Sequence, residues 1–146
     1  MSVVPQYIAD TNILLRFLMN DHAEHGKAAQ GLVRAASDGN LVLVVPYMAL
    51  AETVFTLRSF YKCDKRATVR ELQALLNSRG IKTTAPGWIK QAFEMYLDHN
   101  ITFGDACIAA EAEHTQLCVA SFDCDFDLLP NVTRFNPLIM GLTGNV

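Results

Sequence analysis

Four carboxylates stand beside apolar segments of this sequence, where a charged side chain needs a partner. Asp10 ends the run YIAD, Asp105 opens the small-residue segment DACIAAEA, and Asp123 follows LCVAS by two residues. Glu52 stands within LVLVVPYMALAETVFTL, which has no other ionisable group except the phenol of Tyr47. A lone buried carboxylate is costly unless it is protonated, paired or bound to a cation. We therefore expect Glu52 to be buried and to need such a partner.

Each aspartate of this set, taken singly, also fits an ordinary structural role as a helix or turn cap. Glu52 does not, because neither a cap nor a solvated face explains a carboxylate in an apolar helix. Four convergent carboxylates repel one another unless a cation binds them. Mg²⁺ and Mn²⁺ suit such a set, because they are hard ions that take oxygen ligands and keep bound water. The sequence therefore predicts that Mg²⁺ or Mn²⁺ is bound by Asp10, Glu52, Asp105 and Asp123.

The segments around these acids alternate between apolar runs and helical periodicity. Strands are predicted at 5–10, 41–45, 81–85, 117–121 and 131–137, and those at 41–45 and 117–121 are expected to be buried. Helices are predicted over 11–21, 22–39, 64–80, 86–100 and 103–116, and another helix has Pro46 in its first turn and contains Glu52. Thr11 is placed to cap the first helix and Gly39 to end the second. The run LVLVV is typical of a strand buried on both faces of a parallel sheet, so one α/β domain over 1–146 is expected.

Composition and charge narrow the class of protein further. The 146 residues are 51% hydrophobic and 18% charged, as in a folded globular chain. The sequence shows no signal peptide and no apolar segment of the ~20 residues that a membrane helix needs. The four cysteines lack paired spacing and are expected to be reduced, partly buried thiols of a cytoplasmic protein. Residues 1–90 carry a net charge of +4 and residues 91–146 one of −7, which indicates either a polyanion guided to a metal or uneven solvated surface.

Three stretches resemble the PIN-domain nucleases, most closely the VapC-type ribonuclease toxins of toxin–antitoxin modules. They are YIADTNILLRFLMND, VPYMALAETVFTL and ITFGDACIAAEAEHTQLCVASFDCDFDLLPNV, which together cover essentially the whole chain in the family's order. The family's Asp-Thr/Ser pair matches Asp10 with Thr11, and its helical glutamate matches Glu52. Its third acid matches Asp105, and its fourth, two residues after a threonine or serine, matches Asp123.

The resemblance implies a three-layer α/β/α sandwich with a central, mainly parallel sheet flanked by helices. It implies a metal-dependent endoribonuclease that cuts single-stranded or loop RNA, works as a homodimer in the cytoplasm, and is covered by a small antitoxin. Glu52 would be a metal ligand or would orient the attacking water, and Thr11 and Ser121 would orient the neighbouring aspartates. The main metal contacts would come from Asp10, Asp105 and Asp123.

Other chemistry-bearing residues have simpler interpretations. Asp125 and Asp127 lie close enough to Asp123 to replace it, but we expect them to be loop or supporting acids. The pair His22 and His25 is expected to mark an exposed helix start rather than a metal site.

A basic stretch could contact RNA phosphates, since such contacts position a chain without reading its sequence. Arg16, one helix away from Asp10, could reach a phosphate as well. An ordinary solvated helix face explains the same stretch equally well. Only Asp64 opposes its cations, which are Arg58, Lys62, Lys65, Arg66 and Arg70.

Two other functions remain open from the sequence. A PIN fold could serve as an RNA-binding or RNA-processing module without a toxin role. A receiver-type signalling domain also has an acidic Mg²⁺ pocket, but it needs two adjacent early acids and a late lysine. Here Asp10 has no acidic neighbour and no lysine follows Lys90. Metal-dependent cleavage of RNA distinguishes a nuclease from both.

Overall fold

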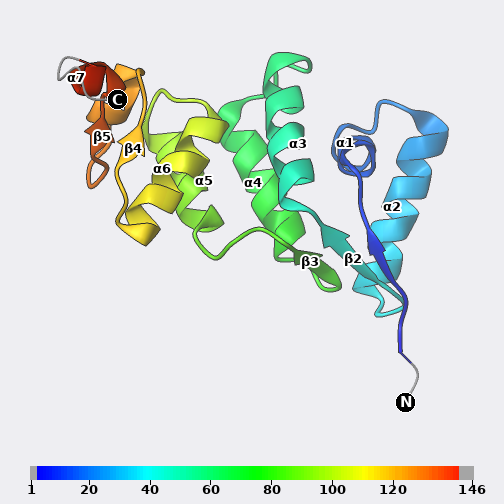
Figure 1. The fold of residues 1–146 in the computed structure, drawn as a ribbon. Coiled ribbons are helices and arrows are strands. Elements are labelled where there is room, and N and C mark those ends of the chain that lie inside the picture. The colour runs from blue at the N-terminus through cyan, green and yellow to red at the C-terminus, as the bar shows by residue number, and fades with distance from the viewer. Residues whose placement is uncertain (1–2, 142–146) are drawn as a thin grey trace. The chain divides into compact units, whose positions relative to one another are not determined.

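A computed structural model describes residues 3–141 of the chain. The chain divides into two compact units, unit 1 (Met1–Pro86) and unit 2 (Gly87–Val146). Figure 1 labels the helices and strands of both. The expectation of a single domain over 1–146 stays a prediction.

Unit 1 is built on a parallel sheet in the order β1-β2-β3. Leu43 of the central strand pairs with Tyr7 on one side and with Ile81 on the other. Both pairings are parallel, as the strand–helix alternation predicts. The bounds of the strands are β1 (Gln6–Ile8), β2 (Val42–Val45) and β3 (Ile81–Thr83).

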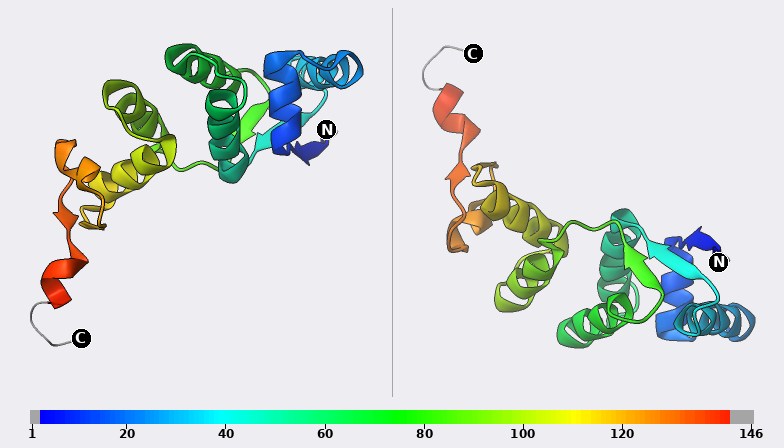
Figure 2. Two further views of the ribbon diagram at one scale, coloured as in Figure 1. Left: turned by 90° about the horizontal axis from the view of Figure 1, so that it is seen from above. Right: turned by 90° about the horizontal axis from the view of Figure 1, so that it is seen from below.

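Two helices form each connection between neighbouring strands of this sheet. Both crossovers step in the same direction along the sheet, and right-handed connections of this kind place their helices on one face. Figure 2 shows α1 and α3 in front of the strands in one view and behind them in the other. The helices are α1 (Thr11–Met19), α2 (Ala23–Ser37), α3 (Tyr47–Ser59) and α4 (Lys65–Leu76).

Two local predictions for unit 1 are wrong. Strand β2 buries Leu43 and Val45 fully but Val42 and Val44 only partly, so it is not buried equally on both faces. Thr11 does not cap α1, because Asp10 has the extended backbone of a cap residue and accepts from the Ile13 N–H at 3.1 Å. The expected stop at residue 39 is confirmed, since Gly39 follows α2 with a φ of +83°.

Unit 2 is centred on a pair of helices joined by aromatic side chains. The ring of Phe103 stacks on Phe93 at 4.9 Å and meets Tyr96 edge-on at 5.5 Å. Alanines of α6 are buried, as expected for a helix rich in small residues. These helices are α5 (Ile89–Asp98) and α6 (Phe103–Thr115).

The remainder of unit 2 is a small parallel sheet with short helices around it. The predicted strand at 117–121 is only two residues long and is not a buried strand, since Leu117 is exposed and Val119 alone is buried. Two short helices were not predicted. The bounds are β4 (Val119–Ala120), η1 (Cys124–Leu128), β5 (Arg134–Phe135) and α7 (Pro137–Gly141).

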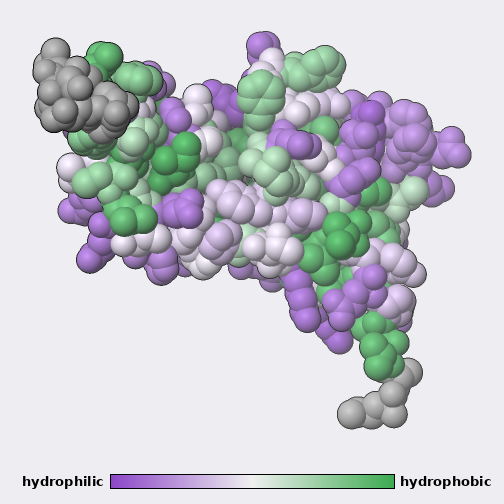
Figure 3. All heavy atoms as spheres, in the orientation of Figure 1, coloured by the Kyte–Doolittle hydropathy of each residue, from purple (hydrophilic) through white to green (hydrophobic). Residues whose placement is uncertain are grey.

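The surface of the described chain bears on two further expectations. No helix within residues 3–141 is long and apolar enough to cross a membrane. All four cysteines are free, but Cys118 and Cys124 are exposed, whereas Cys63 is partly buried and Cys107 is buried. Hydrophobic side chains gather over the edge of the unit 1 sheet in Figure 3, where β1 is exposed along its length.

Candidate active site

The first half of the acid set lies at the carboxyl end of β1 and on α3. Asp10 directly follows the strand region and caps α1, which aims its carboxylate at the start of that helix. The hydroxyl of Thr11 donates to Oε2 of Glu52 at 2.7 Å. Unit 1 therefore brings Glu52 against the residue that follows Asp10, although 41 positions of sequence separate Thr11 from Glu52.

Glu52 is exposed, so the prediction that it is buried is wrong. The physical reason is that α3 has a single buried face, which carries Leu50, Val54 and their neighbours. Glu52 shares the opposite face with Met48 and Phe55, whose exposed fractions are 70% and 72%. Because these exposed positions are occupied by apolar residues, the sequence pattern indicated a helix that is buried on all sides. The hydroxyl of Thr11 donates to this exposed carboxylate.

The expected role of Thr11 also changes with this contact. The sequence predicted that Thr11 orients the neighbouring aspartate, but its hydroxyl donates to Glu52 instead. The Asp10 carboxylate is oriented by the main chain, through the Ile13 N–H. This arrangement follows from the helix start, where an aspartate competes well for the cap position and leaves the next side chain available.

The second half of the acid set lies in unit 2. Asp105 is half-buried in the first turn of α6, and its N–H donates to the hydroxyl of the cap residue Thr102 at 3.1 Å. Asp123 is exposed and caps η1, with Oδ1 accepting from the Asp125 N–H at 2.8 Å. The Ser121 hydroxyl accepts from the Asp123 N–H at 2.9 Å. Ser121 thus contacts the main chain of Asp123, and its orienting role stays a prediction.

Arg134 lies beside this loop and was missed by the sequence analysis. Its guanidinium forms a two-pronged ion pair with Asp127, at 3.0 and 2.9 Å, and donates to the Ser121 carbonyl at 3.1 Å. The ion pair lowers the pKa of Asp127 below its usual range. Asp127 is therefore engaged by Arg134, in keeping with a supporting role. The signal was present in the sequence, since Arg134 is the only lysine or arginine in residues 91–146.

The chemistry of these donors fits a hard divalent cation. All four are carboxylates, and three of them, Asp10, Glu52 and Asp123, are exposed. Across residues 3–141, no three His, Cys, Asp or Glu side chains form a group able to hold a metal ion. Unit 1 carries Asp10 and Glu52, and unit 2 carries the other two. The metal assignment of the four acids stays a prediction.

The other candidate residues named from the sequence lie in unit 1. Arg16 pairs with Asp21 at 2.9 Å, so the cation expected to reach a phosphate is already engaged by a carboxylate. His22 caps α2 by accepting from the His25 N–H at 3.0 Å, and the two exposed rings stack at 4.0 Å. The prediction that these histidines mark a helix start is confirmed. The basic stretch lies at the end of α3 and the start of α4.

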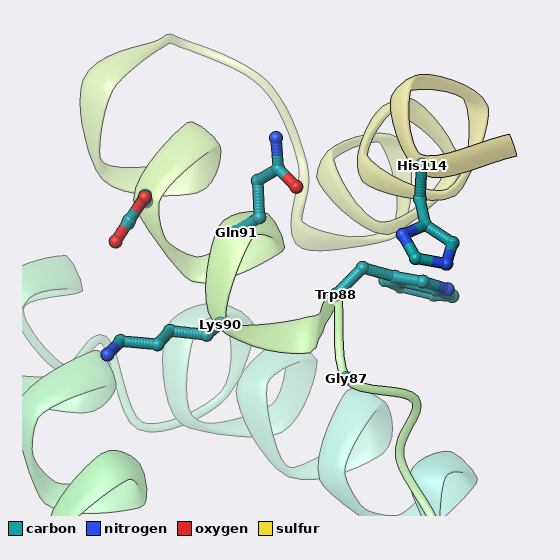
Figure 4. A pocket seen from close by; sticks show the side chains of 6 residues that line it. Gly87, Trp88, Lys90, Gln91 and His114 are labelled. Carbon is teal, nitrogen blue, oxygen red and sulfur yellow. The ribbon is translucent and has the colours of Figure 1, made fainter. Parts of the chain in front are cut away.

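A pocket of about 480 Å³ lies elsewhere on unit 2 (Figure 4). The imidazole of His114 lies over the indole of Trp88 there. None of the four acids lines this pocket, so it is separate from the predicted metal ligands. Its lining residues are Gly87, Trp88, Lys90, Gln91, Glu94 and His114.

A comparison with known protein families identifies the family of this chain. The sequence profile of the PIN domain matches residues 7–131. The chain belongs to the PIN domain family. The matched range includes Asp10, Glu52, Asp105 and Asp123, and the α/β fold with parallel strand pairing is confirmed. PIN domains are nucleases that generally use divalent metal ions.

Solved structures similar to this PIN domain include two from bacteria. One is VapBC2 from Rickettsia felis bound to a DNA fragment from its promoter, with 17% identity, a TM-score of 0.36, and coverage of 90% of this chain and 98% of that one. Another is VapC20 from Mycobacterium tuberculosis, a sarcin–ricin loop cleaving toxin, with 23% identity, a TM-score of 0.37, and coverage of 84% and 93%. No curated protein matches the sequence.

Proposed function

We propose that this PIN domain is a metal-dependent endoribonuclease that cuts single-stranded or loop RNA as the toxin of a toxin–antitoxin pair. Membership of the PIN family supports nuclease activity. The hydrogen bond from Thr11 to Glu52 carries the assignment of the site, because it fixes the helical glutamate beside the Asp10–Thr11 pair. The toxin role rests on the likeness of the three sequence stretches to VapC-type proteins.

In this proposal the four carboxylates act as one set. Asp10, Asp105 and Asp123 are the main ligands of Mg²⁺ or Mn²⁺, which when bound activates a water and stabilises charge on the scissile phosphate. Thr11 holds the Glu52 carboxylate at 2.7 Å, in one orientation for a ligand or for the attacking water. Arg134 engages Asp127, so Asp127 is less available to a cation than Asp123 is.

The partners in this proposal follow from the same sequence resemblance. RNA is the substrate, a small antitoxin covers the site, and the active form is a homodimer in the cytoplasm. The net charge of −7 over residues 91–146 makes a cation necessary before a polyanion approaches the acids of that segment.

Cleavage of a mixed RNA pool tests the proposal. Wild-type protein should cut RNA with Mg²⁺ or Mn²⁺ and stop when a chelator is added. Asp10→Asn, Asp105→Asn and Asp123→Asn should each lower the cleavage rate about a hundredfold or more, because each removes charge from the set that stabilises the transition state.

Matched controls remove a carboxylate elsewhere in each unit. Asp38→Asn in unit 1 and Asp98→Asn in unit 2 should cut RNA at the wild-type rate. Near-normal cleavage by two of the three site variants would show that the site has been assigned to the wrong residues.

A further inference from the structure

The turn between α3 and α4 of unit 1 carries a cluster of positive charge. We call residues 60–66 the basic turn; it contains Lys62, Lys65 and Arg66, and Arg58 precedes it. The side chains of Lys62 and Arg66 form no hydrogen bond or ion pair with another residue in the described part of the chain. Burial lowers the pKa of Lys65, and repulsion from Arg58 and Arg66 lowers it further. Lys65 therefore lies close enough to Arg58 and Arg66 to be repelled by both.

This charge also opposes the helix that follows. Lys65 and Arg66 begin α4, and the acid at the helix start is the cap residue Asp64, which accepts from the Ala67 N–H at 2.9 Å. Cations are unfavourable at a helix N-terminus, where the peptide dipoles present partial positive charge. Residues that work against their own local structure are expected at functional sites. An anion bound to the basic turn would relieve the repulsion at Lys65 and would add a second negative charge, besides Asp64, at the start of α4.

The basic turn is held in place by contacts from α1 and from the loop after it. The Tyr61 hydroxyl donates to Asp21 at 2.7 Å, and Asp21 also accepts from Arg16 at 2.9 Å. The thiol of Cys63 contacts the sulfur of Met19 at 3.7 Å.

The main chain of the turn is fixed as well. The Cys63 N–H donates to the Leu57 carbonyl at 2.8 Å, and the Arg58 guanidinium donates to the Cys63 carbonyl. Lys62 has the left-handed φ of 58°, which non-glycine residues rarely adopt. A surface fixed in this way gives up little conformational entropy when a ligand binds.

We propose that the basic turn is a preformed surface for the phosphates of single-stranded RNA, and that the Arg16–Asp21–Tyr61 contacts position it. The inference rests on the proposed nuclease function, because it names where the RNA strand lies beyond the cleavage site. The turn begins eight residues after Glu52 along α3, about 12 Å along the helix axis. A strand of a few nucleotides spans that distance, so one RNA can reach both. Arg16 thus serves as a positioning residue rather than as a phosphate ligand.

The test measures RNA binding without cleavage. The full chain is titrated into a fluorescein-labelled single-stranded RNA of mixed sequence, with EDTA present, at several KCl concentrations. The variant is Lys62→Gln, Lys65→Gln and Arg66→Gln combined. It should bind at least about tenfold more weakly at low salt, and its slope of log affinity against log salt should fall by about two, since each lost phosphate contact contributes about 0.7.

A matched variant loses the same charge elsewhere on unit 1. Arg34→Gln, Arg79→Gln and Lys82→Gln combined should keep the wild-type slope and nearly the wild-type affinity. Equal losses in the two triple variants would overturn the proposal, because binding would then depend on net charge alone.

Tyr61→Phe tests the positioning role, since it removes one hydroxyl and no cation. It should bind about threefold more weakly with an unchanged salt slope, because the same phosphate contacts form from a less ordered turn. Circular dichroism at the binding temperature confirms that the variant is folded. Wild-type affinity in the folded variant would show that the Tyr61–Asp21 contact serves stability alone.

Two further results separate this inference from the proposed function. Loss of binding in the basic-turn variant, together with a wild-type protein that cuts no RNA with Mn²⁺, would support the surface and reject the nuclease. Metal-dependent cleavage by a wild-type protein whose two triple variants bind alike would reject the surface only. Polyglutamate that displaces the RNA as well as unlabelled RNA does would overturn the choice of RNA in favour of an acidic protein partner.

Discussion

The contact between Thr11 and Glu52 joins two residues whose roles depend on each other. Glu52 is on an exposed helix face, where a free glutamate would sample several rotamers. The Thr11 hydroxyl holds one of its oxygens at 2.7 Å and so reduces that freedom. Groups that orient a metal-binding carboxylate in this way matter nearly as much as the carboxylate itself.

Thr11→Val tests this role, because valine keeps the branched shape and removes the hydroxyl. We expect cleavage or Mn²⁺ affinity to fall about 10- to 100-fold. Thr11→Ser keeps a donor and should retain most of the activity. Both rates are measured on the same RNA at saturating Mn²⁺. Equal activity of the valine variant and wild type would limit the contact to a structural role.

Tyr61 offers a prediction that depends on pH. Its hydrogen bond to Asp21, and then its burial, raise the pKa of the phenol, because a tyrosinate would face a carboxylate. The folded pKa lies above the unfolded value, so this stabilisation is complete below the unfolded pKa and is lost as pH rises through the folded pKa. In an ultraviolet titration one tyrosine should ionise later than the others, and Tyr61→Phe should remove that late step. Asp21→Asn should move it to lower pH.

The sequence predicted elements better than exposure, for a physical reason. Helix starts depend on local signals, so Asp64 and Thr102 cap α4 and α6 where the pattern places them. Exposure depends on which neighbours pack against a segment, and the sequence does not contain that information locally. Glu52 was therefore expected inside and lies outside, and Leu117 was expected in a buried strand and is 68% exposed.

The junction between α4 and β3 depends on one glycine. Gly80 has a φ of +80°, and a Cβ at this position would collide with the backbone carbonyl of Ala36 in α2. Gly80→Ala should therefore lower the free energy of unfolding by at least about 2 kcal/mol.

Gly31→Ala is the control for that substitution, because Gly31 lies within α2 and a Cβ there meets nothing within 4 Å. It should stabilise the protein by roughly 0.5–1 kcal/mol. Urea unfolding of both variants measures the difference. A Gly80 variant as stable as wild type would show that the junction relaxes without cost.

At the scale of the whole molecule, the sequence predicts the candidate site as a set of acids, and this stays a prediction, whereas the contacts around these acids could not be predicted. Ordered motifs point to Asp10, Glu52, Asp105 and Asp123, because each has a recognisable neighbour in the sequence. Arg134 contacts Asp127, and Tyr61 contacts Asp21, which is 40 positions away in the sequence. Neither pair belongs to a recognisable sequence motif. Such pairs become visible only when the chain is folded.

Metal binding should stabilise the entire fold if the four acids share a cation. At a Mn²⁺ concentration of about 100 times Kd, the free energy of unfolding should rise by about 2.7 kcal/mol, and EDTA should reverse the gain. Asp105→Asn should lose this response, yet be at least as stable as wild type without metal, because it relieves repulsion between acids. Thermal melts with and without Mn²⁺ measure both effects. The same Mn²⁺ response in wild type and in Asp105→Asn would place the metal elsewhere.

The exposed thiol of Cys124 has a practical consequence for experiments on this protein. It directly follows Asp123, and its sulfur lies 3.9 Å from the Arg134 guanidinium. A maleimide dye attached there would sit next to a proposed metal ligand, while Cys118→Ser would remove the other exposed thiol. Quenching of that dye by paramagnetic Mn²⁺ would then report Mn²⁺ binding beside Asp123 in real time. The four carboxylates of the proposed site would all remain intact in that protein.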